Sequence, residues 1–218
     1  MKNILLSRTD NIGDVVLSLP LAAYLKKISP HLKIFFLARD YTQAVVEAYP
    51  EVDEFISLEK LFKAGEQKAL ADLKDKKIDT ALHIFPNKKL AQLFKKACIP
   101  VRLGSRSRLY HWWTCTKTVS LKRSGSFLHE SLLNFKLLGP LLSQKIPSRK
   151  ELSSFCHLKK ITPSQRVQKL LEGDKKKLLI HPGTNGHTKQ WPESHFKSLI
   201  KELEKKDVKI ILTGSQEE

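Results

Sequence analysis

The sequence has few cysteines and no long apolar run. Its 218 residues include three cysteines and no CxxC pair, which argues against a disulfide framework or a zinc knuckle and for a reducing compartment. No apolar run approaches the roughly 18–20 residues that would span a bilayer. The short run after Lys2 is interrupted by Ser7, Arg8 and Asp10, too early for the apolar core of a signal peptide. We therefore expect a cytoplasmic protein.

Acidic residues are also scarce, and two common phosphate-binding motifs are absent from the sequence. There are 22 Asp and Glu against 39 Lys and Arg, for a formal net charge of +17. Such an excess predicts an acidic partner: nucleic acid, an anionic membrane face or a phosphorylated substrate. Neither GxxxxGK[ST] nor GxGxxG occurs, so the sequence supports neither a P-loop nor the usual dinucleotide fold.

Apolar strand-like runs alternate with helix-like segments along most of the chain. This rhythm predicts an α/β fold with parallel sheets covered on both faces. We expect a first domain over residues 1–140, a linker rich in Pro, Ser and Lys over 141–160, and a second, incomplete domain over 161–218 that holds about two strands. Pro20 predicts a kink or a restart in the first helix.

The stretch 102–126 departs from this rhythm and reads as a basic, aromatic loop. Arg106 and Arg108 lie close to Trp112 and Trp113. Arginine forks suit phosphate and carboxylate groups, and tryptophan suits sugar faces or a membrane interface. Single-stranded nucleic acid uses the same mixture, so a nucleic-acid partner stays open as an alternative.

The first candidate site is the loop in "SRTDNIGDVVLSLP", residues 7–20. It follows a predicted strand, at the sheet edge where α/β proteins bind ligands. Asp14 would lie in the first helical turn, where the helix dipole favours its ionised form, and it could accept a proton from an attacking hydroxyl. The alternative is that Asp14 merely caps or complements the helix N-terminus. Asp10 reads as a turn residue.

The second candidate site is "HPGTNGHTKQWPESHF", residues 181–196, again between a strand and a helix. Gly183, Thr184 and Asn185 offer backbone N–H groups and a hydroxyl, and Lys189 adds a positive charge. This combination suits a diphosphate. His181 and the histidine at 187 lack the carboxylate or cysteine partners of a metal site.

The two motifs together resemble the lipopolysaccharide heptosyltransferases, glycosyltransferase family 9. "NILLSRTDNIGDVVLSLPLAAYLKK" is similar to the family's opening, and "HPGTNGHTKQWPESHFKSLIKEL" followed by "VKIILTGS" is similar to the start of its nucleotide-sugar domain. "HESLLNFKLLG" between them also fits. The resemblance implies a GT-B fold of two Rossmann-like domains, the first for the acceptor and the second for the nucleotide sugar.

The resemblance also implies roles for individual residues. Asp14 matches the candidate general base, Lys189 the lysine that contacts the donor diphosphate, and Gly183, Thr184 and Asn185 the neighbouring phosphate loop. A ribose-contacting acid would be Glu217 or Glu218. On the acceptor side we expect Arg8, Arg106, Arg108 and His129.

The implied reaction is inverting transfer of heptose from ADP-heptose to the lipopolysaccharide inner core, with no metal and no other cofactor. The enzyme would work at the cytoplasmic face of the inner membrane, where a basic surface meets anionic lipid. The family's further Asp-Ser/Thr-Gly-x-x-His segment does not occur in this sequence, which predicts a C-terminally shortened chain. A non-catalytic protein that binds the anionic glycolipid acceptor is the alternative, and a basic nucleic-acid-binding protein is a further one.

Overall fold

The computed structural model describes residues 1–121, 126–142, 146–159, 161–183 and 191–214. Within it the chain forms two compact units, unit 1 over Met1–Ile161 and unit 2 over Thr162–Glu218. Each unit contains a parallel sheet, so the predicted α/β class is confirmed. No helix among the described residues is long and apolar enough to cross a membrane.

The sheet of unit 1 has six parallel strands in the order β3-β2-β1-β4-β5-β6. This is the doubly wound order. In such sheets the strand order reverses beside the first strand, and ligands bind outside the carboxyl ends of the strands at that point, which here are the ends of β1 and β4. The strands are β1 (Asn3–Ser7), β2 (Lys33–Ala38), β3 (Glu54–Ser57), β4 (Thr80–His83), β5 (Val101–Ser105) and β6 (Lys117–Val119).

The central strands are buried on both faces. In β1, Ile4 and Leu6 join one core cluster and Leu5 joins the other. Phe35 and Phe36 of β2 divide in the same way, because successive side chains point to opposite faces. A strand with two buried faces must be apolar throughout, which explains the uninterrupted runs in the sequence.

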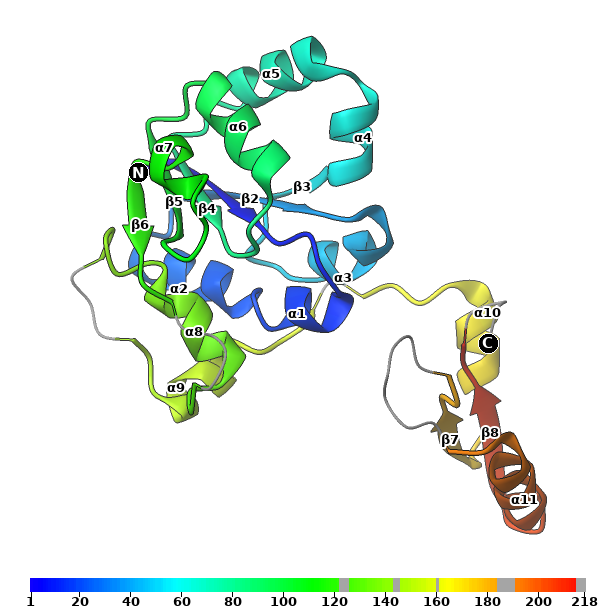
Figure 1. Ribbon diagram of the computed structural model, residues 1–218. Helices are drawn as coiled ribbons and strands as arrows, with labels where there is room; N and C mark the ends of the chain where they lie inside the picture. Colours follow the sequence, from blue (N-terminus) through cyan, green and yellow to red (C-terminus); the bar gives the residue numbers. More distant parts are fainter. Residues whose placement is uncertain (122–125, 143–145, 160, 184–190, 215–218) are drawn as a thin grey trace. The chain divides into compact units, whose positions relative to one another are not determined.

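Helices cover both faces of this sheet. Figure 1 shows α4, α5 and α6 on one side and α1, α2, α8 and α9 on the other. The helices of unit 1 are α1 (Ile12–Val16), α2 (Pro20–Ile28), the 3-10 turn η1 (Asp40–Thr42), α3 (Gln43–Glu47), α4 (Leu58–Lys63), α5 (Glu66–Asp75), α6 (Lys88–Lys96), α7 (His111–Thr114), α8 (Glu130–Lys136) and α9 (Arg149–Ser154).

The predicted break in the first helix is confirmed, because Pro20 is the first residue of α2. Proline suits that position, where its missing N–H would have had no intrahelical partner. Residues 58–75 form two helices, α4 and α5. Gly65, with φ of 83°, separates α4 from α5, and glycine adopts this left-handed conformation without a steric penalty.

The stretch 102–126, expected to be a loop, contains most of β5 and all of α7 and β6. Its many basic and aromatic residues break the apolar pattern by which strands are predicted, so the two short strands were not expected. Nor is 141–160 a free linker, since it includes α9 and belongs to unit 1. Leu152 and Phe155 enter the core, the Tyr49 hydroxyl donates to the Phe155 carbonyl oxygen, and His157 Nε2 lies 3.0 Å from the Glu51 carboxylate.

Unit 2 has strands β7 (Lys176–Ile180) and β8 (Val208–Leu212), paired in parallel. Helix α11 (Glu193–Glu204) lies between them in the chain, and α10 (Gln165–Leu171) precedes β7. Ile180 is the one buried side chain within the described ranges 162–183 and 191–214. Two strands provide little core of their own.

His83 ends β4 and is fully buried, with Phe94 stacked on one side and His111 on the other. Burial, followed by the positive charges of His111 and Arg102, lowers the pKa of His83 from 6.5 to about 3. The unfolded chain therefore takes up a proton at His83 below pH 6.5, whereas the folded chain does not. We expect stability to fall as the pH drops through this window.

A His83→Leu variant should show a smaller loss of stability between pH 6.5 and 3 than the natural chain, by up to about 1.4 kcal/mol per pH unit. Urea unfolding at a series of pH values measures this slope. Leu109→Ala, at an exposed side chain that does not titrate, is the control and should leave the slope unchanged. Equal slopes for His83→Leu and the natural chain would contradict the assignment.

Candidate active site

A buried arginine at the carboxyl end of β1 organises the first candidate site. Arg8 directly follows β1, and its side chain is only 4% exposed. Its Nε donates to Asp10 Oδ1 at 2.7 Å, and its Nη2 lies 2.9 Å from Asp14 Oδ1. Its Nη1 lies 3.1 Å from Glu130 Oε1 and 3.4 Å from Asn134 Oδ1. One guanidinium therefore joins the loop after β1 to helix α8.

This arrangement follows from the geometry of the arginine fork. A guanidinium presents five N–H donors in one plane and stays charged in proteins. Three carboxylates surround it, so each ion pair offsets part of the free energy of burying the others. We name Arg8, Asp10, Asp14, Glu130 and Asn134 the Arg8 cluster.

Asp14 is the most accessible carboxylate of the Arg8 cluster, with 34% of its side chain exposed. It lies in the first turn of α1, whose N-cap is Asn11, and no side-chain hydrogen bond caps that helix. Asp14 is therefore not the side-chain cap of α1, but its place in the first turn agrees with the alternative that it complements the helix N-terminus. The Ser18 hydroxyl donates to the Asp14 carbonyl oxygen at 2.8 Å, and the Asn134 amide donates to the Leu17 carbonyl oxygen. These bonds hold the α1 turn against α8.

Asp10 does more than form a turn. Burial raises the pKa of its carboxyl above 3.8, and the bond from Arg8 opposes that rise. Its carbonyl oxygen also accepts from the Tyr41 hydroxyl at 3.1 Å. Glu130 and Asn134 were not among the residues expected from the sequence, although both lie in the "HESLLNF" segment. The available signal in the sequence was an asparagine between Leu133 and Phe135, and the structure shows that Asn134 is fully buried.

The four residues expected on the acceptor side do not all come together. Arg8 is buried, and its N–H groups face its protein partners. His129 is exposed and caps α8, with Nδ1 2.6 Å from the Ser131 hydroxyl, so it adjoins Glu130. Arg106 and Arg108 are exposed on the segment that follows β5.

The second candidate site begins at the carboxyl edge of the sheet in unit 2. His181 Nδ1 lies 3.0 Å from the Thr213 carbonyl oxygen, and the Thr213 N–H donates to the Ile180 carbonyl oxygen. These bonds tie the ends of β7 and β8 together, and Gly183 follows two residues later, partly buried. Thr184, Asn185, Lys189, Glu217 and Glu218 lie outside the described residues. The described residues contain no group of three His, Cys, Asp or Glu able to hold a metal ion.

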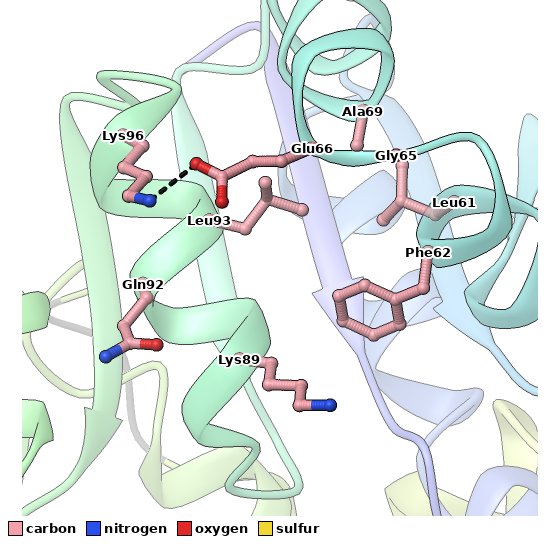
Figure 2. A pocket seen from close by; sticks show the side chains of 9 residues that line it. All are labelled: Leu61, Phe62, Gly65, Glu66, Ala69, Lys89, Gln92, Leu93 and Lys96. Carbon is pink, nitrogen blue, oxygen red and sulfur yellow. Dashed lines mark hydrogen bonds and ion pairs between the residues drawn. The ribbon is translucent and has the colours of Figure 1, made fainter.

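A pocket of about 210 Å³ lies elsewhere in unit 1, among α4, α5 and α6. Figure 2 shows Phe62 and Lys89 facing it and the Lys96–Glu66 ion pair beside it. None of its lining residues belongs to the Arg8 cluster. The pocket is therefore separate from the Arg8 cluster.

Comparison with known families decides the relationship. A family model described as glycosyltransferase family 9 (heptosyltransferase) matches residues 68–218. The chain belongs to glycosyltransferase family 9. A Haemophilus influenzae protein with a provisional glycosyltransferase name is 27% identical over 227 residues, which cover 98% of this chain and 64% of that protein.

Solved structures of this family share the fold. The Veillonella parvula family 9 glycosyltransferase matches with a TM-score of 0.79 and 21% identity, over 99% of this chain and 63% of its own length. The Escherichia coli ADP-heptose lipopolysaccharide heptosyltransferase II matches with 0.72 and 21%, over 100% and 65%. Escherichia coli heptosyltransferase WaaC, bound to ADP-2-deoxy-2-fluoro heptose, matches with 0.73 and 17%, over 99% and 70%. The predicted GT-B-type α/β organisation is confirmed, and the chain spans less than two thirds of the first two relatives.

Replacing Arg8 with methionine should lower the free energy of unfolding by about 3 kcal/mol, because three partly buried carboxylates would lose their cation. Arg8→Lys should lose less, since lysine keeps the charge but not the fork. Urea unfolding measures both changes. Lys68→Met, which breaks an exposed i,i+4 pair with Asp72, is the control and should change stability by under about 1 kcal/mol. An Arg8→Met loss no larger than that of the control would contradict the organising role.

Proposed function

We propose that this family 9 chain acts in the transfer of a heptose from ADP-heptose to the inner core of lipopolysaccharide, with inversion at the anomeric carbon. Membership of the family carries the proposal. It is supported by the solved relatives, two of which are named as heptosyltransferases, one with an ADP-heptose analogue bound. The proposed acceptor side is unit 1 and the proposed donor side is unit 2.

In the proposed reaction Asp14 is the general base. As an acceptor hydroxyl oxygen forms a bond to the anomeric carbon, its proton passes to the Asp14 carboxylate. The bond from the anomeric carbon to the diphosphate breaks, and ADP leaves with the electron pair. Arg8 contacts one Asp14 oxygen and thereby orients the carboxylate towards the hydroxyl.

On the donor side, Lys189 would offset the charge that develops on the leaving diphosphate. Gly183, Thr184 and Asn185 would donate backbone N–H groups to the same phosphates, and Glu217 or Glu218 would contact the ribose. The tie between His181 and Thr213 supports this assignment, because it places the start of the loop at the carboxyl edge of β7 and β8. The proposed reaction uses no metal ion and no further cofactor.

The proposed acceptor is a glycolipid dense in phosphate and carboxylate groups, which suits a chain of net charge +17. Arg106, Arg108 and His129 are the exposed candidates to meet it. Work on such an acceptor would place the protein at the cytoplasmic face of the inner membrane. Nucleic acid remains the lesser alternative for the same basic surface.

Asp14→Asn should reduce heptose transfer by about 10²–10⁴-fold, because the amide cannot accept the proton. The fold should persist, since the amide oxygen can still accept from Arg8. The measurement is transfer from ADP-heptose to heptose-deficient lipopolysaccharide, with Asp72→Asn on the exposed surface of α5 as the control. Turnover by Asp14→Asn equal to that of the natural chain would refute the base assignment.

Saturating ADP should raise the thermal midpoint of the natural chain. A site filled at about 100 times its Kd adds about 2.7 kcal/mol, which corresponds to roughly 5–10 °C for a chain of this size. Lys189→Ala should remove the shift, and Lys175→Ala, an exposed partner of Asp207, should keep it. A cooperative transition that ignores ADP would contradict donor binding and favour a non-catalytic, acceptor-binding chain.

A further inference from the structure

The segment 106–113, between β5 and the end of α7, exposes three large apolar side chains within five residues. Leu109 is 75% exposed, Trp112 64% and Trp113 57%. Arg106 and Arg108 on the same segment are also exposed. Single exposed apolar residues are ordinary on protein surfaces, but a contiguous group beside cationic side chains marks an interaction surface.

The protein core holds these side chains outward. His111 and Thr114 of α7 are buried, at 0% and 1% exposure, and the neighbouring Trp112 and Trp113 therefore face away from the core. His111 Nδ1 lies 2.8 Å from the Ser105 carbonyl oxygen, and the Thr114 hydroxyl donates to the Tyr110 carbonyl oxygen. The exposure is a consequence of packing.

A glycine permits this arrangement. A Cβ on Gly104 would lie 2.6 Å from His111 Nδ1 and 2.9 Å from Cys115 Sγ, closer than non-bonded atoms approach. With no side chain at 104, the His111 ring can lie directly over β5. The buried side of α7 is thus matched to the strand, and its Trp-bearing side has no such match within the described residues of unit 1.

The chemistry of the segment favours a lipid bilayer over a nucleic acid. The Trp112 indole N–H already donates to the Arg106 carbonyl oxygen at 3.1 Å, so the ring can enter an apolar layer without losing a hydrogen bond. Leu109, the most exposed of the three, cannot stack on a base. Tryptophan concentrates at membrane interfaces, and arginine beside it matches anionic headgroups.

We propose that Leu109, Trp112 and Trp113 enter the interface of an anionic bilayer, while Arg106 and Arg108 contact lipid phosphates. The proposal rests on the proposed function, because a glycolipid acceptor lies in such a bilayer. The lipid phosphates of the bilayer itself are the partner, whether or not the acceptor is present.

The three tryptophans of the chain, Trp112, Trp113 and Trp191, allow a direct test. In a Trp191→Phe variant of this chain the tryptophan fluorescence comes from the proposed surface alone. Vesicles of phosphatidylcholine with phosphatidylglycerol should shift its emission to the blue, and brominated acyl chains should quench it. Phosphatidylcholine vesicles should do neither. Failure to bind acidic vesicles, or binding without a shift and quenching, would overturn the proposal.

Co-sedimentation with the same acidic vesicles tests the individual residues. Arg106→Ala and Arg108→Ala should each weaken binding about fivefold, and Trp112→Ala with Trp113→Ala by at least about tenfold. Matched controls are Trp191→Ala, which removes a tryptophan 49% exposed, and Lys88→Ala with Lys89→Ala on α6. Equal losses in the controls would reduce the effect to net charge and overturn the proposal.

The ADP-induced thermal shift separates this proposal from the proposed function. Trp112→Ala with Trp113→Ala should keep that shift while losing vesicle binding. A natural chain that binds vesicles through its tryptophans but ignores ADP would retain the membrane surface and refute donor binding. A chain whose thermal midpoint rises with ADP but which does not bind acidic vesicles would support donor binding and refute the membrane surface.

Discussion

The contacts of the Arg8 guanidinium are the interaction on which the candidate active site depends. A single cation, placed where β1 ends, binds the carboxylates of Asp10, Asp14 and Glu130. Without it, three acidic side chains would repel one another at the edge of a buried sheet. The same contacts attach helix α8, more than a hundred residues away in the sequence, to the turn that carries Asp14. The same guanidinium therefore both orients the proposed base and attaches helix α8.

The position of Arg8 follows from a sheet that is buried on both faces. Parallel strands need helices above and below, and the chain therefore crosses from one side to the other beside β1. The reversal leaves the carboxyl ends of β1 and β4 without a helix crossing directly over them. Arg8 follows β1 at this place and His83 ends β4, so the fold itself brings polar groups to an edge between two apolar layers.

Neighbouring residues of α7 face opposite ways, His111 into the core and Trp112 and Trp113 towards the surface. His111 packs over Gly104 and stacks on His83 at the end of β4. Trp112 and Trp113 face away from the core. A four-residue helix thus joins the core to a cationic, aromatic surface. In the proposed function that surface would meet a bilayer, and the Arg8 cluster would meet the sugar hydroxyl of a lipid-linked acceptor.

The sequence by itself determined the α/β class, the alternation of strands and helices along most of the chain, and the two loops that follow β1 and β7, because apolar periodicity and turn residues are local signals. It suggested Asp14 from one motif. Only the tertiary structure decided that Arg8 is buried among carboxylates, that Asp10 belongs with them, and that Glu130 and Asn134 complete the cluster. Likewise, only distant partners decided that β5 and β6 are strands and that α9 packs within unit 1. Local sequence patterns reflect the secondary structure that a residue favours. Ion pairs and edge strands depend on neighbours that come together only when the chain folds.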